Sequence, residues 1–205
     1  EQYGIREHRY VGETKSHAID ISSASMERDP AKCILCGRCV RVCHEVQKVG
    51  AIDFTKRGFT SIVTTPYNKG LNVSDCILCG QCILVCPTAA LREKSTIKEV
   101  ANAIYDRKKY CIAQVAPAVR ASLGEEFNMS LGTDVTGLLV TGLRRLGFNK
   151  VFDTNFAADL TIMEEASELI HRVQNGGSLP MFTSCCPGWV KYVEMNRPEV
   201  LEHVS

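Results

Sequence analysis

The most regular pattern of apolar positions lies in the C-terminal half of the chain and predicts a long helix. Apolar side chains recur there at steps of three and four, at Phe156, Leu160, Met163, Ala166, Ile170 and Val173. This spacing gives a helix one apolar face, and Gly176 and Gly177 mark its end. The same period over residues 135–146 predicts a second helix, with Asp134 as its cap and Gly147 as its stop.

Short apolar runs between these segments predict strands. Residues 111–116 form one such run, which stops at Pro117, and residues 151–154 and 180–183 form two more. Pro187 suits the first turn of another helix. The alternation of strands and helices indicates an α/β domain with some parallel pairing after about residue 95.

The N-terminal half is organised differently, because it contains an internal repeat. Residues 33–43 read CILCGRCVRVC and residues 76–86 read CILCGQCILVC, so eight of eleven positions are identical at an offset of 43. The β-branched run at residues 60–65 predicts a short strand between the two copies. Residues 1–32 are polar, and we expect them to form a lead-in segment.

Composition identifies a folded protein and draws attention to cysteine. Of 205 residues, 45% are hydrophobic and 23% are charged, which excludes a disordered chain. No apolar run approaches the ~18 residues of a membrane helix, and 24 basic against 23 acidic residues do not indicate nucleic-acid binding. The 11 cysteines are an odd number and eight lie in the repeats. They indicate metal binding in a reducing, cytoplasmic setting rather than a disulfide framework.

The repeated spacing C-x2-C-x2-C-x3-C is typical of ferredoxins with two 4Fe–4S clusters, in which the fourth cysteine of each run binds the other cluster. The expected ligands of cluster one are Cys33, Cys36, Cys39 and Cys86, and those of cluster two are Cys76, Cys79, Cys82 and Cys43. We expect the fourth cysteine to begin a helix that points away. Two zinc ribbons or a disulfide scaffold are the alternatives. Both account less well for two runs that each contain four cysteines within eleven residues.

A third candidate site lies at residues 180–189, which read PMFTSCCPGW. Cys185 and Cys186 are either two inert, buried small side chains or a reactive pair. A helix that starts at Pro187 puts Cys186 at a helix N-terminus, where the dipole favours the thiolate. Cys111 stands alone, and we expect it to be a core residue.

The segment TSCCPGW at 183–189 resembles the first signature of the catalytic domain of iron-only (FeFe) hydrogenases. APAVR at 116–120, GTDVTG at 132–137 and NFAADLTIMEEASEL at 155–169 are similar to that family in the same order. The resemblance implies an α+β ferredoxin-like domain with two 4Fe–4S clusters at residues 33–95, followed by the start of an α/β hydrogenase catalytic domain at residues 96–205.

The same resemblance implies roles for several residues of the second domain. The family's active site is the H-cluster, a 4Fe–4S cube joined to a two-iron subcluster. Cys186 matches a ligand of the cube, and Cys185 matches the thiol that exchanges protons with the two-iron centre. Ala116 and Pro117 match backbone positions that line the pocket of the two-iron centre.

A proton route to the surface is also implied, through Glu165, Glu168 and Ser205, with Arg172 at its outer end. On a helix, Glu165, Glu168 and Arg172 share one face. Taken by themselves, the same residues fit a solvated flank with a Glu168–Arg172 surface pair.

These features lead to the hypothesis that the chain is the middle portion of an FeFe hydrogenase, an enzyme that interconverts dihydrogen with protons and electrons. No cysteine follows Cys186, whereas relatives supply three further cube ligands later in the chain, so we expect this portion alone to be inactive. The expected electron partner is a ferredoxin or the NAD(H)-linked subunits of a multimeric hydrogenase. The alternatives are an electron-transfer subunit without hydrogen chemistry and a hydrogenase-like iron–sulfur assembly protein, and Cys185 argues against the second.

Overall fold

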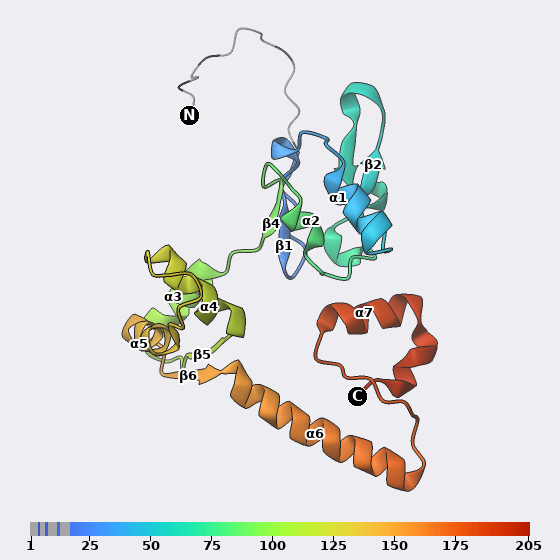
Figure 1. Ribbon diagram of the computed structural model, residues 1–205. Helices are drawn as coiled ribbons and strands as arrows, with labels where there is room; N and C mark the ends of the chain where they lie inside the picture. Colours follow the sequence, from blue (N-terminus) through green and yellow to red (C-terminus); the bar gives the residue numbers. More distant parts are fainter. Residues whose placement is uncertain (1–3, 5–6, 8–11, 13–16) are drawn as a thin grey trace. The chain divides into compact units, whose positions relative to one another are not determined.

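The computed structural model describes residues 17–205 together with Gly4, Glu7 and Gly12. The chain divides into two compact units (Figure 1). One unit joins Glu1–Lys94 to Cys186–Asn196, and the other joins Ser95–Cys185 to Arg197–Ser205. The division suggested by the sequence treats residues 96–205 as one piece, whereas residues 186–196 group with the first unit.

Two small antiparallel sheets and short helices make up the first unit. Strand β1 (Met26–Arg28) pairs with β4 (Leu91–Glu93), and β2 (Asp53–Thr55) pairs with β3 (Ile62–Thr64). The helices of this unit are α1 (Arg38–Arg41), α2 (Gln81–Leu84) and α7 (Pro187–Asn196). Strand β1 lies in the segment that the sequence assigns to a lead-in. Its alternation is hidden because Arg28, a charged residue, shares the buried face with Met26.

The two cysteine repeats adopt the same backbone conformation. Leu35 and Leu78, at matching positions, have positive φ angles of 58° and 61°. Gly37 and Gly80 follow with φ angles of 70° and 73°, and they cap α1 and α2. A left-handed Leu costs roughly 1–2 kcal/mol, so the strain recurs where the chain curls around the first three cysteines of each run.

The expectation that the fourth cysteine begins a helix is wrong. Cys39 and Cys82, the third cysteines, lie within α1 and α2. Cys43 lies in a π-helical turn, Val42–Val46, directly after α1, and Cys86 follows the end of α2. The short helix therefore carries the chain from the third cysteine to the fourth, and the fourth side chain emerges at its C-terminal end.

The core of the first unit lies between its sheets and its cysteine loops. The buried members are Met26, Cys39, Ile52, Val63, Leu71 and Leu91. All seven of the other repeat cysteines are packed against this cluster or line the cavities beside it, so the apolar core and the cysteine-lined cavities share their walls. Burying a side chain such as Leu71, which is 1% exposed, is worth about 1.5–3 kcal/mol.

A parallel strand pair and four helices form the second unit. Strand β5 (Ile112–Val115) pairs in parallel with β6 (Lys150–Asp153), as the alternating pattern predicts. The helices are α3 (Ile97–Tyr105), α4 (Pro117–Glu126), α5 (Thr136–Leu146) and α6 (Thr154–Asn175). Residues 180–183 do not form the expected strand. Only Phe182 pairs, in a single parallel bridge to Val204, because Pro180 has no amide hydrogen to continue a ladder.

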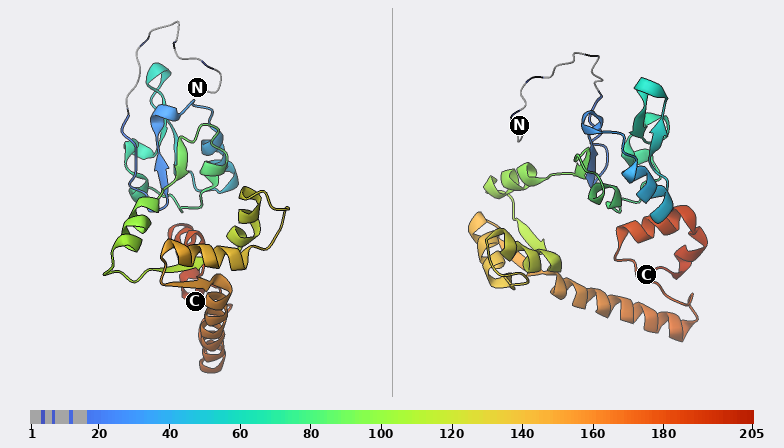
Figure 2. Two further views of the ribbon diagram at one scale, coloured as in Figure 1. Left: turned by 90° about the vertical axis from the view of Figure 1, so that its left-hand side faces the viewer. Right: turned by 45° about the horizontal axis from the view of Figure 1, so that its top comes forward.

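Helix α6 is a single unbroken helix, longer at both ends than predicted (Figure 2). The Asp153 carboxylate accepts a hydrogen bond from the Asn155 amide at its start, and Gly176 ends it with φ of 75°. Its apolar face is open, with Phe156 57% and Met163 69% exposed. Among the described residues, no helix has the length and apolar composition needed to cross a membrane.

Candidate iron–sulfur and hydrogenase site

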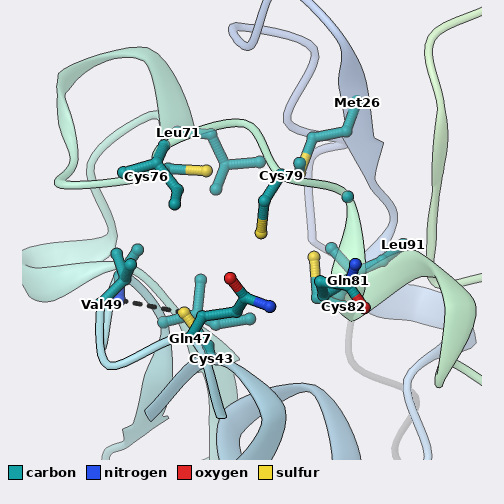
Figure 3. Close-up of a pocket in the computed structure, with 14 residues that line it drawn as sticks. Met26, Cys43, Gln47, Val49, Leu71, Cys76, Cys79, Gln81, Cys82 and Leu91 are labelled. Carbon is teal, nitrogen blue, oxygen red and sulfur yellow. Dashed lines mark hydrogen bonds between the residues drawn. The ribbon is translucent and has the colours of Figure 1, made fainter. Parts of the chain in front are cut away.

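Four cysteines from both repeats surround one cavity in the first unit, called cavity two because it would hold cluster two. Figure 3 shows the sulfur atoms of Cys76, Cys79 and Cys82, from the second repeat, turned toward the same space as that of Cys43, from the first. The remaining wall is apolar and includes Met26 and Leu71. The Ala51 amide donates a hydrogen bond to Cys43 Sγ at 3.3 Å. The Cys43 thiol, which comes from the first repeat, is therefore held by the backbone that follows that repeat.

A separate cavity, called cavity one because it would hold cluster one, contains the complementary set of cysteines. Cys33, Cys36 and Cys39 of the first repeat line it together with Cys86 of the second. Ile52 and Leu91 line both cavities, so the two thiol sets are separated by a shared apolar wall. The structure therefore groups the eight thiols in the crossed pattern on which the ligand prediction rests.

Burial and backbone amides set the acidity of these thiols in opposite directions. Burial raises the pKa of Cys39 to about 11 and that of Cys82 to about 12. Burial also acts to raise the pKa of Cys86, but hydrogen bonds from the amides of Leu91, Thr88 and Ala90 and from the Thr88 hydroxyl lower it below its usual value. The Cys86 thiol, which lines cavity one, therefore has a pKa shifted in the direction that favours the thiolate.

The loop backbone adds to this preference for a negatively charged group. Successive amides around a left-handed residue form a concave nest that binds anions, including iron–sulfur clusters. Leu35 and Leu78 supply the left-handed residue in the first and second loops, respectively. An Ala side chain at Gly37 would bring Cβ to 3.1 Å from the Phe54 ring, so this glycine also allows close packing against β2.

The cysteines and their surroundings fit 4Fe–4S clusters. Each cavity offers four soft thiol ligands, the number that a cubane needs, one at each corner. Among the residues that the structure describes, no three Cys, His or acidic side chains converge on one point as ligands of a single ion do. Arg28, which lines cavity one, also has a buried donor without a hydrogen-bond partner among the described residues, Nε.

The paired cysteines at residues 185 and 186 are both exposed, which goes against the alternative that they are inert core residues. The Cys186 carbonyl accepts the Val190 amide at 3.1 Å, so Cys186 caps α7, as expected from Pro187. Cys186 belongs to the first unit and Cys185 to the second. Ala116 caps α4 and Pro117 begins it, and both are exposed. Their grouping with the cysteines stays a prediction.

Two of the residues implied in the proton route are in direct contact. Ser205 Oγ donates a hydrogen bond to Glu165 Oε1 at 2.9 Å, across 40 residues of sequence. The Ser205 amide donates to the Phe182 carbonyl at 2.8 Å, which fixes the chain end beside α6. Ser184 Oγ lies 2.9 Å from Ser205 Oγ and extends the hydrogen-bonded chain to the residue before Cys185.

Arg172 is held firmly at the other end of this face of α6. Its guanidinium pairs with Glu168, with Nε 3.0 Å from Oε1, and donates to the carbonyls of Ser178, Glu202 and Val204. This is more than the solvated surface pair that the spacing alone suggests. Glu165 and Glu168 line the same open cavity, together with Ser184 and Ser205.

Sequence reasoning missed Ser184 and Arg28. Ser184 lies inside the recognised TSCCPGW segment, but its contact with Ser205 depends on a long-range bridge that no local pattern indicates. Arg28 lies five residues before the first ligand, and only its 6% exposure marks it as unusual. Cys111, expected in the core, is only half-buried at the start of β5.

Two family models match successive parts of the chain, and the second includes residues 186–196, which group with the first unit in the structure. Residues 32–90 match the 4Fe-4S dicluster domain, and residues 109–205 match the iron only hydrogenase large subunit, C-terminal domain. The chain is 50% identical to iron hydrogenase 1 of Clostridium pasteurianum over 196 residues, which is 96% of this chain and 34% of that protein.

Two further similarities extend this result. The chain is 48% identical to the NADP-reducing hydrogenase subunit HndD of Solidesulfovibrio fructosivorans, covering 98% of this chain and 36% of that one. The apo FeFe-hydrogenase HydA1 of Chlamydomonas reinhardtii has 44% identity and a TM-score of 0.50 over 55% of this chain and 30% of its own.

The fold and the cavities therefore define an iron–sulfur protein with a 4Fe–4S dicluster domain in a mixed α/β chain. The chain belongs to the iron-only hydrogenase family. It spans about a third of the length of the curated relatives it matches. The cofactors of this family are the two 4Fe–4S clusters and, in the complete protein, the H-cluster.

Proposed function

We propose that this chain is the electron-relay domain and the first part of the catalytic domain of an FeFe hydrogenase, which interconverts dihydrogen with two protons and two electrons. The observation that carries the proposal is the pair of four-thiol cavities on one apolar wall, in a chain that matches hydrogenases over nearly its whole length. When bound, the 4Fe–4S clusters transfer single electrons and the H-cluster supplies the hydrogen chemistry.

In this proposal, Cys33, Cys36, Cys39 and Cys86 hold one cluster, and Cys76, Cys79, Cys82 and Cys43 hold the other. Ile52 and Leu91 lie against both cavities and exclude water from the space between them. An apolar wall of this kind limits the reorganisation that accompanies electron transfer and keeps the clusters from hydrolysis.

The role of Cys186 is to hold a corner of the H-cluster cube, and its position as the cap of α7 fixes its backbone at the start of that helix. Cys185 is the proton-exchanging thiol beside it. Ala116 and Pro117 line the two-iron pocket with backbone groups. Each of these roles is carried over from the family motif at the matching position.

Proton delivery uses the hydrogen-bonded groups on α6. Glu165 exchanges protons with Cys185, and Ser205, bonded to Glu165 at 2.9 Å, passes them toward Glu168. Arg172 holds the outer carboxylate, Glu168, in place through an ion pair. A hydroxyl between two carboxylates can accept and donate in the same step, which is why Ser205 suits this position.

We further propose that electrons are exchanged with a nicotinamide-linked partner subunit. The support is the relative named as an NADP-reducing hydrogenase subunit, which matches 98% of this chain. Reduction of the loaded protein by a ferredoxin, with no response to a nicotinamide-linked partner, would instead favour the ferredoxin alternative.

The test uses the full-length protein that contains this chain. Cys185→Ala should leave the iron content and cluster spectra unchanged and lower hydrogen turnover by about 10²–10⁴-fold, because the proton-exchanging thiol is lost. Cys186→Ala should weaken retention of the H-cluster cube. A wild-type protein that holds two cubanes, shows no carbonyl infrared bands and makes no hydrogen would establish the electron-transfer alternative.

A further inference from the structure

We propose that Arg28 donates its Nε–H to a sulfur of the cluster held by Cys33, Cys36, Cys39 and Cys86, and that this makes cluster one the more easily reduced of the two. The inference rests on the ligand sets of the proposed function. It concerns the potentials of the clusters and does not depend on hydrogen turnover.

Arg28 is a buried cation whose guanidinium is only partly satisfied by protein. Its exposure is 6%, although Arg is normally a surface residue. One terminal nitrogen donates to the Val63 carbonyl at 3.0 Å, and the other lies 3.4 Å from Asn68 Oδ1 and 3.6 Å from Asp20 Oδ2. These contacts hold the fork of the guanidinium in one orientation.

The remaining donor of the group, Nε–H, has no hydrogen-bond partner among the described residues. A buried donor without a partner is expensive, and native structures rarely retain one without a bound group that it contacts. Arg28 lines the cavity of cluster one, next to Cys33 and Cys39. A cluster sulfur in that cavity is the acceptor that would complete the set.

Cavity two has no such donor. Its lining residues carry no charged side chain, and apart from the cysteines the polar ones are Gln47 and Gln81. Lys191 of α7 acts on Cys76 through its charge, but an ammonium is a point charge on a flexible stem, whereas the Arg28 guanidinium is fixed by three partners. The two repeats therefore differ in their surroundings despite their near-identical ligand loops.

Reduction adds one electron to a cluster that its four thiolates already make anionic. A hydrogen-bond donor or a cation next to the sulfurs stabilises the reduced form more than the oxidised form and raises the potential. Asp20 offsets part of the Arg28 charge at 3.6 Å, and Asp29 at the cavity wall is paired with Lys32. The hydrogen bond is therefore the main difference between the cavities.

The test is a reductive titration of the full-length protein, with the clusters followed by electron paramagnetic resonance. Arg28→Lys keeps a positive charge and removes Nε–H. It should lower the reduced-to-oxidised ratio of cluster one at a fixed potential by about tenfold, or about 59 mV for one electron. Cluster two should be unchanged, and Cys79→Ser, which alters the spectrum of cluster two, shows which potential has moved.

Arg92→Lys is the matched control, because Arg92 lies on the strand paired with β1 and forms an exposed ion pair with Glu27 at 2.8 Å. It should shift neither potential. Asp20→Asn removes the charge that offsets Arg28 and should raise the potential of cluster one, so the proposal remains testable if Arg28→Lys fails to load iron. Unchanged potentials in both iron-replete variants, or equal shifts of both clusters, would overturn it.

The outcome is separate from that of the proposed function. A protein without hydrogen turnover that still shows the selective shift would support the role of Arg28 and reject the hydrogenase activity. An active hydrogenase whose cluster potentials do not change when Arg28 is replaced would support the hydrogenase activity and reject the role of Arg28.

Discussion

The Ser205 hydroxyl is the point at which the proposed proton route is most easily broken without unfolding the protein. Ser205→Ala removes Oγ, which donates to Glu165 at 2.9 Å and lies 2.9 Å from Ser184 Oγ. The backbone contact of Ser205 with Phe182, at 2.8 Å, does not involve the side chain and should persist. Position and packing of the chain are therefore kept while the relay is interrupted.

The effects expected on stability and on turnover differ strongly in size. Two partly buried hydrogen bonds together contribute about 1–3 kcal/mol, which in a protein of this size corresponds to a fall in Tm of several degrees. Loss of a positioned proton-transfer group slows a reaction by roughly 10²–10⁴-fold. A stability loss of this size leaves the protein folded at room temperature, so it does not account for such a fall in turnover.

The assay compares hydrogen evolution by wild type and Ser205→Ala at equal iron content in the full-length protein. The matched control is Ser167→Ala, since Ser167 lines the same cavity but donates to the Met163 carbonyl of its own helix at 2.7 Å. Ser167→Ala should retain turnover within about twofold, as expected of an exposed helical serine. If Ser205→Ala retains turnover to the same extent, protons do not pass through Ser205 and the route is wrong.

Three further predictions concern the first unit. Cys43→Ala should remove iron from the cluster of the second repeat and Cys86→Ala from that of the first, visible as complementary losses in cluster spectra; loss from the mutated repeat itself would contradict the crossed ligand sets. Leu71→Ala, at a 1% exposed core position that lines cavity two, should cost about 2–5 kcal/mol in denaturant unfolding; a cost below about 1 kcal/mol would contradict the core assignment. Burial acts to raise the pKa of Asp20, but hydrogen bonds from Ser22 and the Leu71 amide, with Arg28, lower it. Its carboxylate therefore adds stability that is present above its usual pKa and is lost as the pH falls through its lowered pKa. Asp20→Asn should reduce this acid-induced loss of the unfolding free energy of the cluster-free protein, measured by denaturant unfolding at a series of acidic pH values.

The parts of the fold that follow from local chemistry were accessible from the sequence. Helix α6 and helix α5 follow from apolar spacing, and Gly176 and Gly147 end them because both adopt left-handed angles. The ligand loops could be predicted because three of four thiols lie within seven residues. Strand β1 could not, since Arg28 interrupts its apolar face and is accommodated only through contacts with Val63 and Asn68, 35 and 40 residues away.

The same distinction applies to the candidate sites. The grouping of Cys43 with the second repeat was predicted from spacing typical of one class of protein, whereas the contact of Ser184 with Ser205 depends on a bridge between Phe182 and Val204 that has no periodic signal. The apolar face of α6 was predicted correctly as a pattern, yet its side chains are exposed in the structure. Periodicity indicates which side chains share a face and does not identify what covers them.

In the proposed ligand sets, the exchange of cysteines between the repeats also determines when each set of four thiols becomes complete during synthesis. Were each repeat self-sufficient, the first set of thiols would be complete once the ribosome had added Cys43. With the cysteines grouped as in the two cavities, the set that includes Cys43 is complete only after Cys82 has been added. The set that begins with Cys33 is complete only after Cys86 has been added. In these proposed ligand sets both become complete within four residues of each other, so neither cluster could have its four thiols before Cys82 has been added.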